Sequence, residues 1–294
     1  MCDSASDLGL FGLNTFDNSA MMKYLPSKTY KELRKVIDEG KVLTSELADE
    51  VAEGLKEWAI ANGATHYAHW FQPMTEAAAE KHECFFDPDS EQKAIVSFSG
   101  KILIKGETDA SSLPSGGLRS TFEARGYTTW DCTSPPIIKK GIPGTQTLLI
   151  PTTFCSYTGE ALDRKTPLLR SMKALSDATV KLLNILGYSD VKSVTPTIGC
   201  EQEYFLIDRK FFQKRKDLVY CGRTLFGAPP AKGQELEDQY YAPISQRVAT
   251  FMGDLDRELW KLGVPAKTQH YEVAPSQYEI APLFADANVG TDHN

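Results

Sequence analysis

Two pairs of glutamates at short spacing constrain this chain more than any other feature. Glu201 and Glu203 come directly before Tyr-Phe-Leu-Ile at 204–207, a run typical of a buried strand. Side chains of a strand alternate between its two faces, so both carboxylates are expected to point to the same side, with Gln202 opposed. The first pair therefore predicts an acidic row on one face of a sheet.

The second pair, Glu272 and Glu279, flanks Ala-Pro-Ser-Gln at 274–277, which is typical of a hairpin turn. If that turn is symmetric about Pro275 and Ser276, Glu272 lies opposite Glu279. Cross-strand partners are roughly 5 Å apart, and like charges there destabilise a sheet unless something neutralises them. Oxygen ligands of this kind suit Mg²⁺ or Mn²⁺ better than zinc. The sequence thus predicts a metal site with the ligands Glu201, Glu203, Glu272 and Glu279.

Three histidines are weaker candidates for the same chemistry. His270 shares a strand face with Glu272, and a supporting role beside the metal is one reading of it. His66 and His69 lie three residues apart on an aromatic segment, which leaves a metal pair open. Because no third ligand lies near them in the sequence, we interpret His66 and His69 as structural histidines.

Composition excludes several classes of partner. The formal net charge of −7 argues against nucleic acid and acidic lipid, and no apolar run approaches the roughly 20 residues of a membrane span. The six cysteines lack Cys-x-x-Cys spacing, which indicates reduced thiols, and the N-terminus has no signal-peptide pattern. We expect a cytoplasmic protein that binds neither nucleic acid nor membrane.

The periodicity of the chain predicts an α+β fold. Apolar spacing indicates helices over 28–39 and 44–62, followed by short strands such as 94–98 and 101–104. Two later helices, beginning at Thr166 and at about residue 244, carry apolar stripes typical of core positions. We expect the second stripe to comprise Ile244, Val248, Phe251, Leu255, Leu259 and Leu262.

The two glutamate segments also carry a family resemblance. Gly-x-Glu-x-Glu-Tyr-Phe-Leu from Gly199, followed by His-x-Glu-Val-Ala-Pro-x-Gln-x-Glu from His270, resembles the metal-binding signature of glutamine synthetase. From about residue 20 onward the chain most resembles the long bacterial type III form. The resemblance implies an N-terminal helical segment (1–63), a β-grasp domain (64–156) and the first part of an antiparallel-sheet catalytic domain (157–294).

A loop in the expected β-grasp domain adds a candidate catalytic residue. Residues 106–120 are a loop by composition, and composition alone favours a plain surface connector. Asp109-Ala-Ser-Ser resembles the Asp-Gly-Ser-Ser loop of the family, with Ala110 in place of the usual glycine. The resemblance implies that Asp109 helps to bind ammonium and reaches the active site of a neighbouring subunit.

Members of this family join glutamate and ammonia at the expense of ATP, through a γ-glutamyl phosphate. By position, Glu203, Glu272 and Glu279 resemble the ligands of one divalent metal, and Glu201 resembles a ligand of the metal that bridges the ATP phosphates. Two metals hold the reactants in line and offset their negative charge. The resemblance further implies glutamate, ammonia and ATP as partners and a homo-oligomer of stacked rings.

Alternatives to this function remain at the level of the sequence. Other carboxylate–amine ligases, such as glutamate–cysteine ligase, and guanidino kinases use related carboxylate sheets. A non-catalytic metal-binding or assembly module of the same fold belongs to a different class. The final Gly-Thr-Asp-His-Asn directly follows a strand without sign of a terminating helix, so we interpret the chain as a truncated enzyme that is inactive alone.

Overall fold

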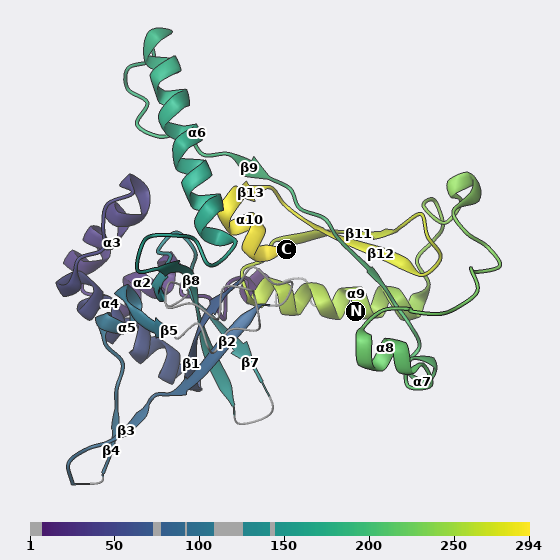
Figure 1. Ribbon diagram of the computed structural model, residues 1–294, viewed down its shortest axis with the longest axis horizontal. Coiled ribbons are helices and arrows are strands. Elements are labelled where there is room, and N and C mark those ends of the chain that lie inside the picture. The colour runs from purple at the N-terminus through teal and green to yellow at the C-terminus, as the bar shows by residue number, and fades with distance from the viewer. Residues whose placement is uncertain (1–7, 73–77, 92, 109–125, 142–144) are drawn as a thin grey trace.

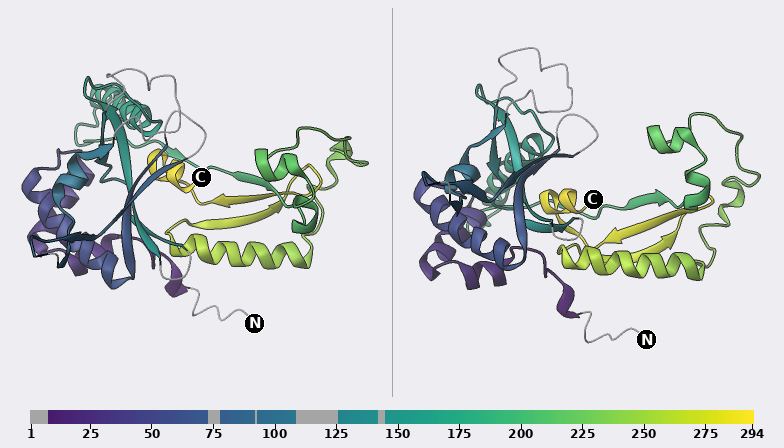
Figure 2. Two further views of the ribbon diagram at one scale, coloured as in Figure 1. Left: turned by 60° about the horizontal axis from the view of Figure 1, so that its bottom comes forward. Right: turned by 90° about the horizontal axis from the view of Figure 1, so that it is seen from below.

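The chain has an α+β architecture with two lobes. The computed structural model describes residues 8–72, 78–91, 93–108, 126–141 and 145–294. One lobe, coloured purple to teal in Figure 1, combines helices with a mixed sheet; the other, green to yellow, is built around an antiparallel hairpin and one long helix. Figure 2 shows the same two lobes from two further sides. The division at 63 and 156 into three domains stays a prediction.

The sheet of the N-terminal lobe is centred on a long strand, β8. Strands run in the order β2-β1-β8-β6-β5, and β7 also pairs with β8. β1 and β8 are parallel, whereas the other pairings are antiparallel. Eight of the eleven residues of β8 are buried because strands flank it on both sides. The strands are β1 (Ala64–Phe71), β2 (Ala79–Cys84), β5 (Gly106–Thr108), β6 (Gly126–Trp130), β7 (Ile137–Lys140) and β8 (Gln146–Ser156), with a separate ribbon of β3 (Phe86–Pro88) and β4 (Ala94–Val96).

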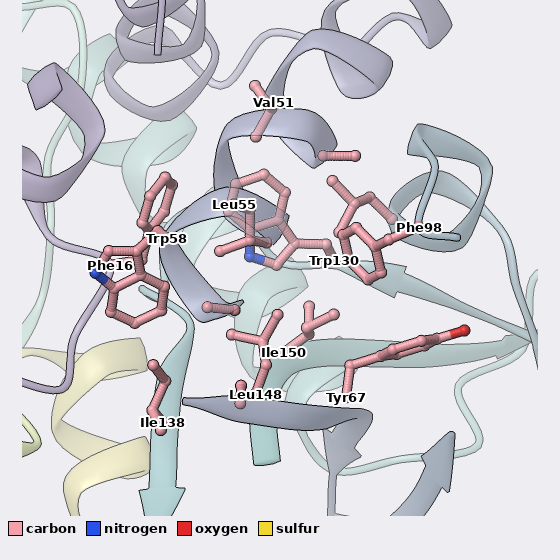
Figure 3. Packing of buried hydrophobic residues seen from close by; sticks show 14 of the residues in the cluster. Phe16, Val51, Leu55, Trp58, Tyr67, Phe98, Trp130, Ile138, Leu148 and Ile150 are labelled. Carbon is pink, nitrogen blue, oxygen red and sulfur yellow. The ribbon is translucent and has the colours of Figure 1, made fainter. Parts of the chain in front are cut away.

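Helices cover one face of this sheet and form the main core with it. Val51, Leu55 and Trp58 of α4 belong to one buried cluster with Leu148 and Ile150 of the sheet, and Figure 3 shows these side chains in the space between helix and strands. The two expected N-terminal helices are therefore confirmed. The helical segments are η1 (Leu8–Leu10), α2 (Asn18–Tyr24), α3 (Ser27–Glu39), α4 (Ser45–Ala61) and α5 (Gly100–Ile104).

The prediction of a strand over 101–104 is wrong, because this segment lies within helix α5. The Gly100 amide donates a hydrogen bond to Asp49 Oδ1 on α4, and the Leu103 side chain is fully buried. A short apolar run fits a buried helix as well as a strand, so periodicity alone does not separate them. Of the expected loop 106–120, the first three residues form β5, and Asp109 lies outside the described residues.

The helix α6 (Lys165–Ile185) projects from the N-terminal lobe (Figure 1). Its apolar stripe was expected to be core, yet Leu175 and Leu182 are 48% and 55% exposed. The expected start at Thr166 is also displaced, because Thr166 N donates to Asp163 Oδ1 at 3.1 Å and already belongs to the helix. Helical spacing predicted the element correctly but not its burial.

The C-terminal lobe contains a three-stranded antiparallel sheet in the order β10-β12-β11. The buried residues of helix α9 are Met252 and Asp256, and the expected Phe251 also contacts the sheet, with its ring centroid 6.1 Å from that of Tyr204. The short helix α10 corrects the expectation that no helix follows the last strand. The elements are β9 (Thr197–Ile198), β10 (Gln202–Phe205), α7 (Arg209–Phe212), α8 (Lys216–Cys221), η4 (Glu235–Glu237), α9 (Gln246–Lys261), β11 (Ala266–Tyr271), β12 (Gln277–Pro282), β13 (Ala285–Asp286) and α10 (Ala287–His293). Among the described helices, none has the length and apolarity needed to cross a membrane.

Candidate metal centre

The three-stranded sheet brings the acidic residues of distant segments into one row. Glu203 on β10 is the cross-strand partner of Glu279 on β12, and Glu279 is the partner of His270 on β11. Residues opposite one another in a sheet point to the same face, so these three side chains lie side by side. The pairing of β10 with β12 is what joins the two glutamate segments.

The hairpin register differs from the expected one. Glu272 was expected opposite Glu279, but His270 occupies that position, and the Glu272 amide donates to the Gln277 carbonyl at 2.9 Å. The connection is longer than a two-residue turn, with Ser276 in a left-handed conformation at φ 65°. Because Glu272 and His270 are two residues apart on one side of the chain, Glu272 still reaches the same face.

The ligand atoms form a compact group. One atom from each of His270, Glu272 and Glu279 lies within 4.8 Å of the others. His270 Nδ1 is 3.0 Å from Glu272 Oε1 and 3.4 Å from Glu279 Oε2. The structure therefore brings both glutamates of the second pair together and adds a histidine.

The first glutamate pair is more open. Glu203 is exposed, and its Oε2 accepts a hydrogen bond from Gln277 Nε2 at 2.6 Å. Glu201 is exposed just before β10, and its charge acts on Glu279. The expectation that residues 204–207 are buried is wrong, since Phe205 and Ile207 are 59% and 49% exposed.

Burial and crowding perturb the carboxyl groups in opposite directions. Burial, the shared hydrogen bond with Glu272 and the charge of Glu201 raise the pKa of Glu279 to about 7. Burial also opposes ionisation of Glu272, but hydrogen bonds from Glu279 and His270 outweigh it, so the pKa of Glu272 is lowered. Just below pH 7 the pair therefore still holds one proton. A divalent cation would replace that proton and relieve the repulsion.

The opposite face of the sheet is apolar and aromatic, which explains why the acidic face is presented. Tyr204, Tyr278 and Tyr271 occupy the next cross-strand row, with ring centroids 6.3 and 4.7 Å apart. α9 lies against this face, where Asp256 Oδ2 accepts a hydrogen bond from Gln269 Nε2 at 2.6 Å. Alternation along each strand then directs the glutamates away from the helix.

Sequence reasoning missed one residue of this site. The ring of Tyr240 stands edge-on to His270 with centroids 4.3 Å apart, and burial and the charges of Glu272, Glu279 and Glu201 raise the pKa of Tyr240. Tyr240 comes from the irregular segment before α9, where no periodic pattern signals a contact.

The other two histidines have structural partners. His69 Nε2 lies 3.0 Å from the Ile102 carbonyl oxygen, and His66 Nδ1 lies 2.8 Å from Thr65 Oγ1. Neither belongs to a metal-sized group within the described part of the chain. These contacts support the structural interpretation.

Comparison with known proteins identifies the family. A model of the glutamine synthetase type III N terminal region matches residues 8–171, and a model of the glutamine synthetase catalytic domain matches residues 180–293. The chain belongs to the type III glutamine synthetase family. It is 53% identical over 286 residues to the type-3 glutamine synthetase of Dictyostelium discoideum, covering 97% of this chain and 39% of that protein. To the glutamine synthetase of Bacteroides fragilis it is 46% identical over 284 residues, covering 97% and 38%.

This type III chain therefore spans about two fifths of the length of its curated relatives. Among solved structures, it is similar to the glutamine synthetase of Plasmodium falciparum, with a TM-score of 0.49 and 17% identity over 81% of this chain and 45% of that one. The expected family and the α+β class are confirmed. Asp109 and the metal ligands stay predictions.

Proposed function

We propose that the whole protein to which this chain corresponds is a glutamate–ammonia ligase, and that the chain supplies carboxylate ligands for its divalent metals. A single observation carries the proposal: Glu203, Glu272 and Glu279 reach one face of one small sheet, although Glu203 is 69 residues or more from the other two in the sequence. Such an arrangement is costly without a cation, as the raised pKa of Glu279 indicates.

In this proposal Glu203, Glu272 and Glu279 hold one Mg²⁺ or Mn²⁺, and Glu201 contributes to a second. Bound metals would offset the charge of ATP and of the substrate carboxylate, which phosphoryl transfer to glutamate requires. The chain's own residues orient those ligands: Gln277 donates to Glu203, and His270 lies against both Glu272 and Glu279. Asp109 remains the proposed ammonium-binding residue, in a cytoplasmic homo-oligomer.

The decisive experiment replaces Glu203 by Gln in the whole protein. We expect loss of glutamine synthesis with little change in folding, because Glu203 is exposed and the amide oxygen of Gln can still accept the hydrogen bond from Gln277. Glutamine formation is measured at saturating ATP, glutamate and ammonia over a range of Mg²⁺ and Mn²⁺ concentrations, with circular dichroism as the folding check.

The exposed Glu57 of α4 provides a matched control, Glu57→Gln, which should retain full activity. Turnover close to wild type in Glu203→Gln at ordinary metal concentrations would remove Glu203 from the site. Tight metal binding by a wild-type protein that forms no glutamine would instead favour a non-catalytic module.

A further inference from the structure

A second site lies between the two lobes, at the end of the hairpin away from the turn that carries Glu272. A cavity of about 330 Å³ opens there. None of the four candidate metal ligands lines it. Its apolar walls come from the N-terminal sheet and from the end of α9 with the residues that follow it: Trp70, Leu149, Pro151, Leu259, Leu262 and Val264.

A buried charge cluster borders this cavity. Lys165 Nζ lies 3.0 Å from Asp131 Oδ2 and 2.5 Å from Asp292 Oδ2, and the side chains of Lys165 and Asp131 are only 7% and 5% exposed. Ser134 Oγ also donates to Asp292 Oδ2, at 2.5 Å. One ammonium is thus shared by two carboxylates, which leaves the cluster with one negative charge in excess.

Asp292 is the member of the cluster that faces the cavity. Its side chain is 19% exposed and lines the cavity, whereas Asp131 does not and instead accepts a further hydrogen bond from Asn288 at 2.6 Å. Within the described part of the chain, Ser134 and Lys165 both donate to Oδ2 of Asp292. Its other carboxylate oxygen, Oδ1, is therefore the acceptor that a ligand would meet.

The remaining ionisable groups of the wall do not compensate this charge. Glu80 and Lys139 neutralise each other at 2.7 Å. Burial lowers the pKa of His293 despite the nearby Asp292 and Asp286, which disfavours its cationic form. The cavity is thus lined mostly by apolar side chains and has one carboxylate whose charge is not balanced. Small-molecule sites have this character and size.

We propose that this cavity binds an apolar amine, with the hydrocarbon portion between Trp70, Leu262 and Val264 and the ammonium group at Asp292. A cation there neutralises the carboxylate charge that the shared Lys165 leaves in excess, and burying the hydrocarbon removes apolar surface from water. Because the walls belong to both lobes, the ligand contacts the N-terminal sheet and α9 together. The site is independent of the proposed ligase reaction.

Two probes that differ only in the polar group test the proposal on the 294-residue chain. Phenethylamine and 2-phenylethanol have the same ring and chain length, and one is a cation at pH 7. For ligands of this size we expect a dissociation constant on the order of 1 mM for the amine. The alcohol should bind at least about tenfold more weakly, since it lacks the charge-assisted contact. Calorimetry measures both.

Variants then locate the binding. Leu262→Trp fills the cavity and should weaken amine binding at least about tenfold, whereas Leu175→Trp adds the same bulk on exposed α6 and should leave it unchanged. Asp292→Asn should reduce the difference between the two probes to less than about threefold.

Equal affinity for amine and alcohol in the wild-type chain would overturn the proposal whether or not any variant folds. Unchanged amine binding in folded Leu262→Trp would overturn it as well, because the ligand would then lie elsewhere. Tighter amine binding that is lost in Leu262→Trp but kept in Leu175→Trp supports it.

Discussion

Replacing Glu279 by Gln should make the metal-free chain more stable at pH 8 while removing its divalent-ion binding. The side chain of Glu279 is only 8% exposed and stands between Glu203 and His270 on the sheet. Burial, the hydrogen bond with Glu272 and the charge of Glu201 raise its pKa to about 7 from the ordinary 4.5. The folded chain therefore holds a proton that the unfolded chain has lost between these two pH values.

The sign of the effect follows from proton linkage. Between pH 4.5 and 7 the folded state binds more protons, so stability falls as pH rises through this window. A shift of this size corresponds to about 3 kcal/mol above pH 7, and the opposite shift of Glu272 offsets part of that cost. Gln resembles the protonated carboxyl and avoids this cost. The gain should be near zero at pH 4.5 and at most about 3 kcal/mol at pH 8.

Urea unfolding at pH 4.5 and pH 8 in the presence of EDTA measures this difference. Glu57→Gln on α4 is the control and should change stability little at either pH. Adding Mg²⁺ at pH 8 should stabilise the wild type by mass action but not Glu279→Gln. A gain in the free energy of unfolding that is the same at both pH values, or a loss at pH 8, would refute the argument that the charged form of Glu279 destabilises the metal-free fold.

Three further predictions concern other parts of the chain. Gly100→Ala should lower the free energy of unfolding by about 1–3 kcal/mol in urea titration, because a Cβ there would meet the Asp49 backbone nitrogen on α4 at 2.4 Å. Lys165→Met should cost about 3–5 kcal/mol in the same assay, since it leaves two carboxylates at a buried position without their shared cation; an unchanged midpoint would mean that the cluster relaxes into water. Asp109→Asn in the whole protein should raise the KM for ammonia more than that for ATP in steady-state kinetics. A KM for ammonia equal to that of the wild type would favour the interpretation of this segment as a surface connector.

The sequence predicted the positions of the helices better than the burial of their side chains. Helix α4 was expected from the apolar spacing of Leu47, Val51, Leu55 and Trp58, because an amphipathic stripe is a local signal. The stripe of α6 is equally regular, but its exposure depends on what packs against it, which no local pattern contains. The Lys165 cluster was not anticipated for the same reason, since Asp292 lies 127 residues from Lys165 in the sequence.

The prediction that the glutamates share one face of the sheet did not depend on the register of the hairpin, which was predicted wrongly. The turn was placed so that Glu272 faced Glu279, whereas the structure pairs Glu279 with His270, two residues earlier. A shift of one residue would have turned Glu272 to the tyrosine face against α9, but a shift of two preserves the face. Strand parity is set by the covalent chain, and register is set by the hydrogen bonds of the turn, such as that from Gln277 to Ala274. Inferences from parity, including the shared face of Glu203, Glu272 and Glu279, therefore tolerate an uncertain turn, whereas an inferred carboxylate-to-carboxylate distance across the hairpin does not.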